Sequence, residues 1–233
     1  MQLTFKNILA FTALLALSFF SFLMLRIMVK YIPVQTDVAF LQIKQDYIHI
    51  TPWLFAFFVH VFSSILVLLA GFTQFSKWVQ KHHRVWHRRL GYVYVLDILI
   101  VTGPASLLMA FFANGGWPSR LAFIVLAVLW LFFTGLALFK ALKKDFRAHR
   151  YFMIRSYALT LSAITLRIWK VVLAGYTDLT PLERYRIIAW LGFGLNLLVA
   201  EWIIYRLRKK RENAGTKYHL RSVRESTISG SVN

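Results

Sequence analysis

Six long apolar stretches separated by short polar segments dominate this chain. Each is close to or above the roughly 20 residues that a helix needs to cross the hydrocarbon core of a bilayer. They lie at residues 8–29, 53–73, 91–113, 119–140, 151–174 and 186–206. The pattern predicts an all-α integral membrane protein with a six-helix transmembrane domain over residues 1–206.

Composition supports a membrane protein. Hydrophobic residues make up 58% of the 233 residues, whereas soluble domains are nearer half apolar. The first apolar stretch continues to Leu25 without a clear cleavage site, which favours an uncleaved first helix over a signal peptide. Residues 207–233 are polar, basic and without periodicity, so we expect a disordered tail there.

The distribution of positive charge predicts the topology. Ten basic residues flank the second to fifth helices in two loops: Lys77, Lys81, Arg84, Arg88, Arg89, Lys140, Lys143, Lys144, Arg147 and Arg150. By the positive-inside rule these loops, and with them both termini, are cytoplasmic. The net charge of +19 is then explained by topology and by anionic lipid headgroups at that face, and nucleic acid is not an expected partner. The absence of cysteine excludes disulfides and thiolate chemistry.

The fifth stretch carries two cations in an apolar setting. Arg155 and Arg167 lie within HRYFMIRSYALTLSAITLR, which begins at His149. A cation near the bilayer centre costs from about 3 to above 10 kcal/mol, so it normally faces a protein interior and a partner. His149 and Arg167 are five helical turns apart on one face. This face suits either helix packing or a buried ligand.

Three pairings are candidates for chemistry. His60 and Arg167 are expected at a similar depth, about 10 Å from the outer interface, where they could hold an anionic group or only pack. Asp97 and Arg155 are expected to form a structural ion pair, with a proton relay through Asp97 as the rival interpretation. His87 and His149 begin the third and fifth helices at one membrane level.

The His87 and His149 pair could supply both axial ligands of a b-type haem iron, as facing helices do in bundle cytochromes. Their position at the bundle boundary argues against this, because haem ligands normally lie deeper. Gly103 and Pro104 are expected to kink the third helix.

Several of these motifs resemble a known bacterial family. HRRLGYVYV at residues 87–95, Trp130, HRYFMIRSYALTLSAITLR, and His60 with Gln74 and Phe75 are similar to the predicted membrane proteins of domain-of-unknown-function family 2306. The resemblance covers residues 60–167 and implies a four-helix bundle core of helices two to five, about residues 53–174. Helices one and six look like additions. It also implies the bacterial cytoplasmic membrane, but no activity.

Two functions follow as hypotheses. The first is a small redox or ligand-binding membrane protein with a haem- or quinone-like cofactor around His60, His87, His149 and Arg167. The second is a non-enzymatic transporter or assembly protein whose buried polar residues are structural. A weaker third is a sensor of anionic lipid that uses Arg84, Arg88, Arg89 and Arg147. No motif supports hydrolase or kinase chemistry.

Overall fold

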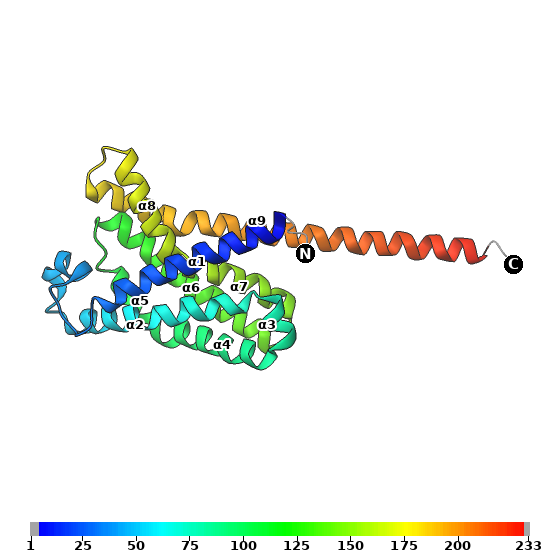
Figure 1. The fold of residues 1–233 in the computed structure, drawn as a ribbon, viewed down its shortest axis with the longest axis horizontal. Helices are drawn as coiled ribbons and strands as arrows, with labels where there is room; N and C mark the ends of the chain where they lie inside the picture. Colours follow the sequence, from blue (N-terminus) through cyan, green and yellow to red (C-terminus); the bar gives the residue numbers. More distant parts are fainter. Residues whose placement is uncertain (1–4, 231–233) are drawn as a thin grey trace.

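The computed structural model describes residues 5–230, which fold as a set of long helices (Figure 1). Four continuous segments are long and apolar enough to cross a membrane, and a bent helix pair makes a fifth. The elements are α1 (Phe5–Val29), η1 (Ala39–Ile43), η2 (Gln45–Tyr47), α2 (Thr51–Gln74), α3 (Lys77–His82), α4 (Arg84–Leu96), η3 (Asp97–Thr102), α5 (Gly103–Ala110), α6 (Trp117–Leu142), α7 (Phe146–Thr160), α8 (Ser162–Tyr176) and α9 (Pro181–Gly230). The protein is therefore a multi-pass helical membrane protein.

The predicted stretches correspond to these elements with two differences. The third begins earlier than expected, at Arg84, and consists of α4, η3 and α5 in series. The fifth is the pair α7 and α8, which bends by 40°. Within α1, the described apolar segment Leu14–Val29 is shorter than the other spans, so a sixth crossing stays a prediction.

The two ends of the bundle differ in charge. We call the end that carries residues 77–89 and 140–150 the basic end, and the end that carries residues 30–50 and 177–180 the opposite end. Helices α4 and α7 both begin at the basic end, and α1 begins and α9 leaves the bundle there as well (Figure 1). Asp145 caps α7 by accepting a hydrogen bond from the Ala148 N–H at 3.0 Å, which lowers the pKa of that carboxyl.

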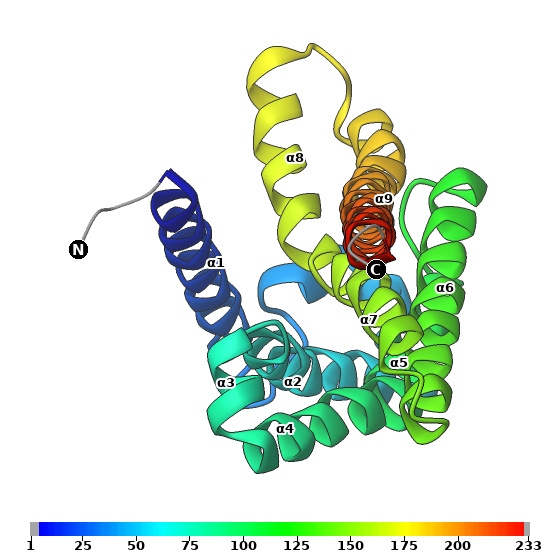
Figure 2. The same ribbon diagram turned by 90° about the vertical axis from the view of Figure 1, so that its right-hand side faces the viewer.

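The buried core draws on five spans. Its largest cluster contains residues of α2, α4 with η3, α6, α7 and α9, including Val67, Tyr94, Trp130, Tyr157 and Phe193. Helix α9 packs against α6, α7 and α8, and Figure 2 shows it flanked by α8 and α6. The sixth predicted stretch, in α9, is thus part of the core. This corrects the expectation that the core consists of helices two to five only. Small residues such as Ala189 permit this close approach.

The span from Arg84 to Ala110 is interrupted by a π-helical turn, η3. Pro104 lacks an N–H, and its ring clashes with the carbonyl four residues earlier in a regular helix, so the helix widens just before it. Gly103 fits this turn because a Cβ there would lie 2.2 Å from the Ile98 carbonyl oxygen. The expected kink is therefore a local change of helix type.

The break between α7 and α8 lies at Leu161 and has a different cause. Thr160 and Ser162 donate to carbonyls of the preceding turn, those of Ser156 and Leu159. Such back-bonding competes with regular helix hydrogen bonds and bends helices. The Asn196 amide of α9 donates to the Ala158 carbonyl at 3.0 Å, which satisfies backbone near the break.

The end of the chain differs from expectation. Helix α9 continues to Gly230 and extends well beyond the bundle in Figure 1, whereas a disordered tail was expected for residues 207–233. Residues 207–230 contain no proline and include many good helix formers, which explains why the helix continues. Residues 231–233 lie outside the described part.

Candidate functional site

His87 and His149 occupy equivalent places on two parallel helices. Each is the fourth residue of its helix, α4 and α7 respectively. The Tyr94 hydroxyl is hydrogen-bonded to the Ser156 hydroxyl at 2.8 Å, and each of these residues lies seven positions after its histidine. Both histidines are therefore two turns from one shared contact, at the basic end. The two imidazoles lie close enough to interact electrostatically.

Their hydrogen bonds leave nitrogen atoms for a ligand. His149 Nδ1 lies 2.8 Å from the Ala137 carbonyl oxygen, and since a carbonyl only accepts, Nδ1 carries the proton and Nε2 carries the lone pair. A backbone carbonyl holds metal-ligating histidines in the same way. Among the described residues, none bonds to the buried Nδ1 of His87. Such an orphaned buried nitrogen is uncommon in folded proteins.

A buried hydroxyl network fixes the two helices in this register. The Tyr94 hydroxyl also bonds Thr160 at 2.8 Å, and the Trp130 indole donates to the same Thr160 oxygen at 3.0 Å. Thr134 joins from α6, 2.7 Å from the Ser156 hydroxyl. The network therefore ties α4, α6 and α7 together two turns above the histidines. Of its members, Tyr94, Trp130, Ser156 and Thr160 lie in the motifs that carry the family resemblance, whereas sequence reasoning did not single out Thr134.

The expected ion pair between Asp97 and Arg155 is replaced by another. Arg155 of α7 forms a bidentate pair with Glu201 of α9, with N–O distances of 2.5 and 2.8 Å. Asp97 instead accepts a hydrogen bond from the Thr102 hydroxyl at 2.5 Å. The correction has two physical reasons. In the register that pairs Tyr94 with Ser156, Asp97 is level with residue 159, about one turn beyond Arg155. In addition, α9 packs against α7 and brings Glu201 to Arg155.

Asp97 belongs to a chain of polar groups along the π-helical turn. The Ser63 hydroxyl lies 2.6 Å from Thr102 Oγ1, the group that donates to Asp97. One turn later, Ser106 donates to the Thr102 carbonyl at 2.6 Å and lies 2.8 Å from His60 Nδ1. This chain links α2 to the third span at the very place where the helix is irregular. π-Helical turns are frequent at functional sites.

Arg167 lies at the far end of this polar chain. It is close enough to His60 and Tyr31 to interact with both electrostatically. Its Nη1 donates to the Ala163 carbonyl at 2.5 Å, and the side chain lines a groove between α1 and α8. The expected proximity of His60 and Arg167 is therefore consistent with the structure.

The four residues expected around one cofactor fall into two groups. The Gln74 amide of α2 reaches the His87 carbonyl at 3.3 Å, so residue 74 marks the level of the histidine pair. His60 lies fourteen residues earlier on α2, about 21 Å along the helix at 1.5 Å per residue. His60 and Arg167 thus cannot share a ligand shell with His87 and His149.

A buried lysine at the opposite end was not anticipated. The Lys44 side chain is 2% exposed, donates to the Phe112 carbonyl and lies 4.7 Å from the Tyr47 ring centroid. Burial, and secondarily Arg120, lower its pKa from 10.5 to about 8. The aromatic residues around it, Phe40, Tyr47 and Trp53, were the signal available in the sequence.

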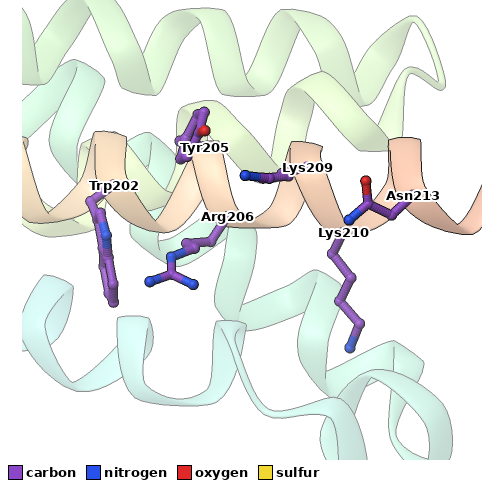
Figure 3. A pocket seen from close by; sticks show the side chains of 6 residues that line it. All are labelled: Trp202, Tyr205, Arg206, Lys209, Lys210 and Asn213. Carbon is purple, nitrogen blue, oxygen red and sulfur yellow. The ribbon is translucent and has the colours of Figure 1, made fainter.

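A second hollow lies on α9 where the helix leaves the bundle. Figure 3 shows side chains that line it: Trp202, Tyr205, Arg206, Lys209, Lys210 and Asn213. The Arg206 guanidinium lies 5.0 Å from the Trp202 ring centroid. Cations beside aromatic rings are typical of the membrane–water interface. None of the predicted site residues lines this hollow.

Comparison with known proteins places the chain in a family. Neither the curated proteins nor the solved structures include a match to it. One family model does match, over residues 57–204, which is well over half of the chain and reaches from α2 through most of the membrane part of α9. The sixth predicted helix is thus included in the match, and the protein belongs to the family described as Predicted membrane protein (DUF2306).

Proposed function

We propose that this protein is a small membrane redox protein that binds a b-type haem through His87 and His149. The observation that carries the proposal is the pair itself: two histidines in register on parallel helices, one with its proton fixed on Nδ1 and the other with a buried nitrogen lacking a partner. Histidine is a common axial ligand of haem iron, and helix bundles build cofactor sites from side chains on facing helices.

Groups beside the pair support the proposal. Arg88 and Arg150 directly follow the two histidines and are exposed, so they could pair with the anionic propionates of a haem. The Ala137 carbonyl orients His149 and raises its basicity as a ligand. A bound haem would supply one-electron chemistry. The chain would hold the imidazoles of His87 and His149 in place and exclude water on the side of the buried core.

The test is the haem content of detergent-purified protein from haem-supplied cells. Pyridine haemochrome analysis should give about one b-type haem per folded chain, reducible by dithionite. A folded, monodisperse protein that remains colourless after both expression with haem and titration with hemin would overturn the proposal.

A second candidate function is transport of a proton or small solute. The third and fifth spans are both interrupted, at η3 and at Leu161, and transporters build midplane sites from such discontinuous helices. The polar chain of Asp97, Thr102, Ser63, Ser106 and His60 lies at the first interruption. Proteoliposomes loaded with a pH-sensitive dye would show dissipation of a pH gradient that Asp97→Asn abolishes; no difference from empty liposomes would exclude proton conduction.

The proposed topology has six spans, with the basic end and both termini in the cytoplasm of a bacterial inner membrane. The positive-inside rule supports it. The chain has no cysteine, so single cysteines can report sidedness. In intact cells, a membrane-impermeant maleimide should label Asp178→Cys but not Asn213→Cys, and the reverse result would invert the topology.

A further inference from the structure

A groove between α1 and α8 combines apolar walls with three cations. It has a volume of about 450 Å³. Its walls include Leu23 and Ile27 from α1 and Ile168 and Val172 from α8. Ile168 of its lining also packs against a neighbouring cluster in which Ile65 of α2 and Ile164 of α8 are buried. Figure 2 shows α1 set apart from α8 on one side of the bundle.

The cations form a series that descends from the opposite end into the membrane. Lys30 and Arg26 are four residues apart, so they lie on one face of the end of α1. Arg167 faces them from α8, nine residues before that helix ends at Tyr176, which is about 14 Å of helical rise. None of the ten lining residues is acidic.

This charge requires compensation from outside the protein. A guanidinium within a membrane-spanning segment is costly unless it meets an anion or water. Within the described part, the hydrogen bond of Arg167 to the Ala163 carbonyl occupies one of five N–H donors. Arg155, on the same span, has its bidentate carboxylate partner in Glu201. The contrast points to an external anion for Arg167.

The apolar residues around the groove determine what kind of anion can reach Arg167. Val171 of the groove lining is 74% exposed, and α1 also exposes Phe19, Phe22 and Leu25, as lipid-facing surfaces do. A ligand entering here comes from the bilayer and must place hydrocarbon against the walls. We infer that the groove binds an anionic phospholipid, with its phosphate at Lys30, Arg26 and Arg167 and an acyl chain along Leu23 and Ile168.

This inference is independent of the haem proposal, and lipid-dependent stability tests it. Full-length protein in a neutral detergent would be titrated with phosphatidylglycerol, and its melting temperature followed. Phosphatidylcholine with the same acyl chains and chainless glycerophosphoglycerol serve as the comparison ligands. The variants are Arg26→Gln with Lys30→Gln, which removes two exposed cations without breaking any described hydrogen bond, and Arg167→Gln. The matched control is Lys170→Gln, an exposed cation on α8 outside the groove lining.

Phosphatidylglycerol should raise the melting temperature of the wild type and of Lys170→Gln, while phosphatidylcholine and the chainless ligand have little effect. Each cation removed should weaken the apparent affinity about fivefold, as expected for about 1 kcal/mol per contact. Equal stabilisation by phosphatidylcholine would overturn charge recognition. Equal stabilisation by glycerophosphoglycerol would indicate a soluble anion instead of a lipid. Loss of the response in Lys170→Gln, or its retention in the double variant, would place binding elsewhere.

Discussion

The two halves of the third and fifth spans are built differently. Toward the basic end, α4 and α7 are regular helices, joined by hydroxyl bonds through Tyr94, Ser156 and Thr160. Toward the opposite end, both spans are interrupted, and ionisable side chains gather at or beyond the interruptions. The regular half holds two histidines in register, and the broken half frees helix faces for a polar chain and a groove. A regular half and an interrupted half thus share the same two spans.

The largest effect on the interrupted half of the third span is expected from a substitution at Gly103. A Cβ at this position would lie 2.2 Å from the Ile98 carbonyl oxygen and 2.5 Å from Leu131, and the backbone atom cannot move aside cheaply. We expect Gly103→Ala to destabilise the fold by about 3 kcal/mol. Gly175→Ala, which meets open space, is the control, and thermal unfolding in detergent is the measurement. Equal stability of the two variants would contradict the description of η3.

The buried Lys44 at the opposite end predicts a pH effect. Its pKa falls to about 8 when folded, so between about pH 8 and 10.5 the unfolded chain binds a proton that the folded chain does not. The unfolding free energy should therefore rise with pH in this window, by up to about 1.4 kcal/mol per unit. Below pH 8 this contribution is constant. Lys44→Met should remove the rise, and identical pH profiles of wild type and variant would show that the pKa of Lys44 is not lowered by folding.

Two of the carboxylates, those of Glu201 and Asp97, should respond unequally to neutralisation. Glu201→Gln removes the charge that pairs with Arg155, and we expect a loss of about 1 kcal/mol for this half-exposed pair. Asp97→Asn retains an oxygen that accepts from Thr102, so its effect should be smaller. Double-mutant cycles that combine Arg155→Gln with each carboxylate substitution measure how strongly Arg155 is coupled to Glu201 and to Asp97. Coupling of Arg155 to Asp97 rather than to Glu201 would restore the arrangement expected from sequence.

The hydroxyl network should contribute modestly to stability. Tyr94→Phe removes its central group, and interhelical hydrogen bonds in membranes are worth about 0.6 kcal/mol on average. Tyr92→Phe, at an exposed neighbouring position, is the control. A melting temperature of Tyr94→Phe equal to that of Tyr92→Phe would show that the network does not fix the register of α4 and α7.

Much of the fold could be predicted because a long apolar stretch that crosses a bilayer must be helical to satisfy its backbone hydrogen bonds. The positions of α2 and α6 correspond closely to the apolar stretches, and α9 contains the sixth stretch but continues to Gly230. The partner of Arg155 could not be predicted in the same way. Depth along a helix follows from residue number, but which helix faces which depends on packing of small residues such as Ala189 and Gly192, and this is not encoded in any one segment.

The candidate site was predictable to a similar extent. The shared level of His87 and His149 followed from their places at the starts of two helices. The separation of His60 and Arg167 from that pair could have been calculated from their depth, since they lie toward the other ends of their spans. The π-helical turn, the network around Thr160 and the cage around Lys44 depend on contacts between distant segments.

The most direct test of the central claim is the ligation of the iron in haem-loaded protein. Absorption and electron paramagnetic resonance spectra would be recorded for the wild type, His87→Ala, His149→Ala and the control His82→Ala. The account predicts a low-spin, six-coordinate haem in the wild type and in His82→Ala, with loss of haem or conversion to high-spin iron in each of the other two. Unchanged low-spin spectra in His87→Ala or His149→Ala would contradict it.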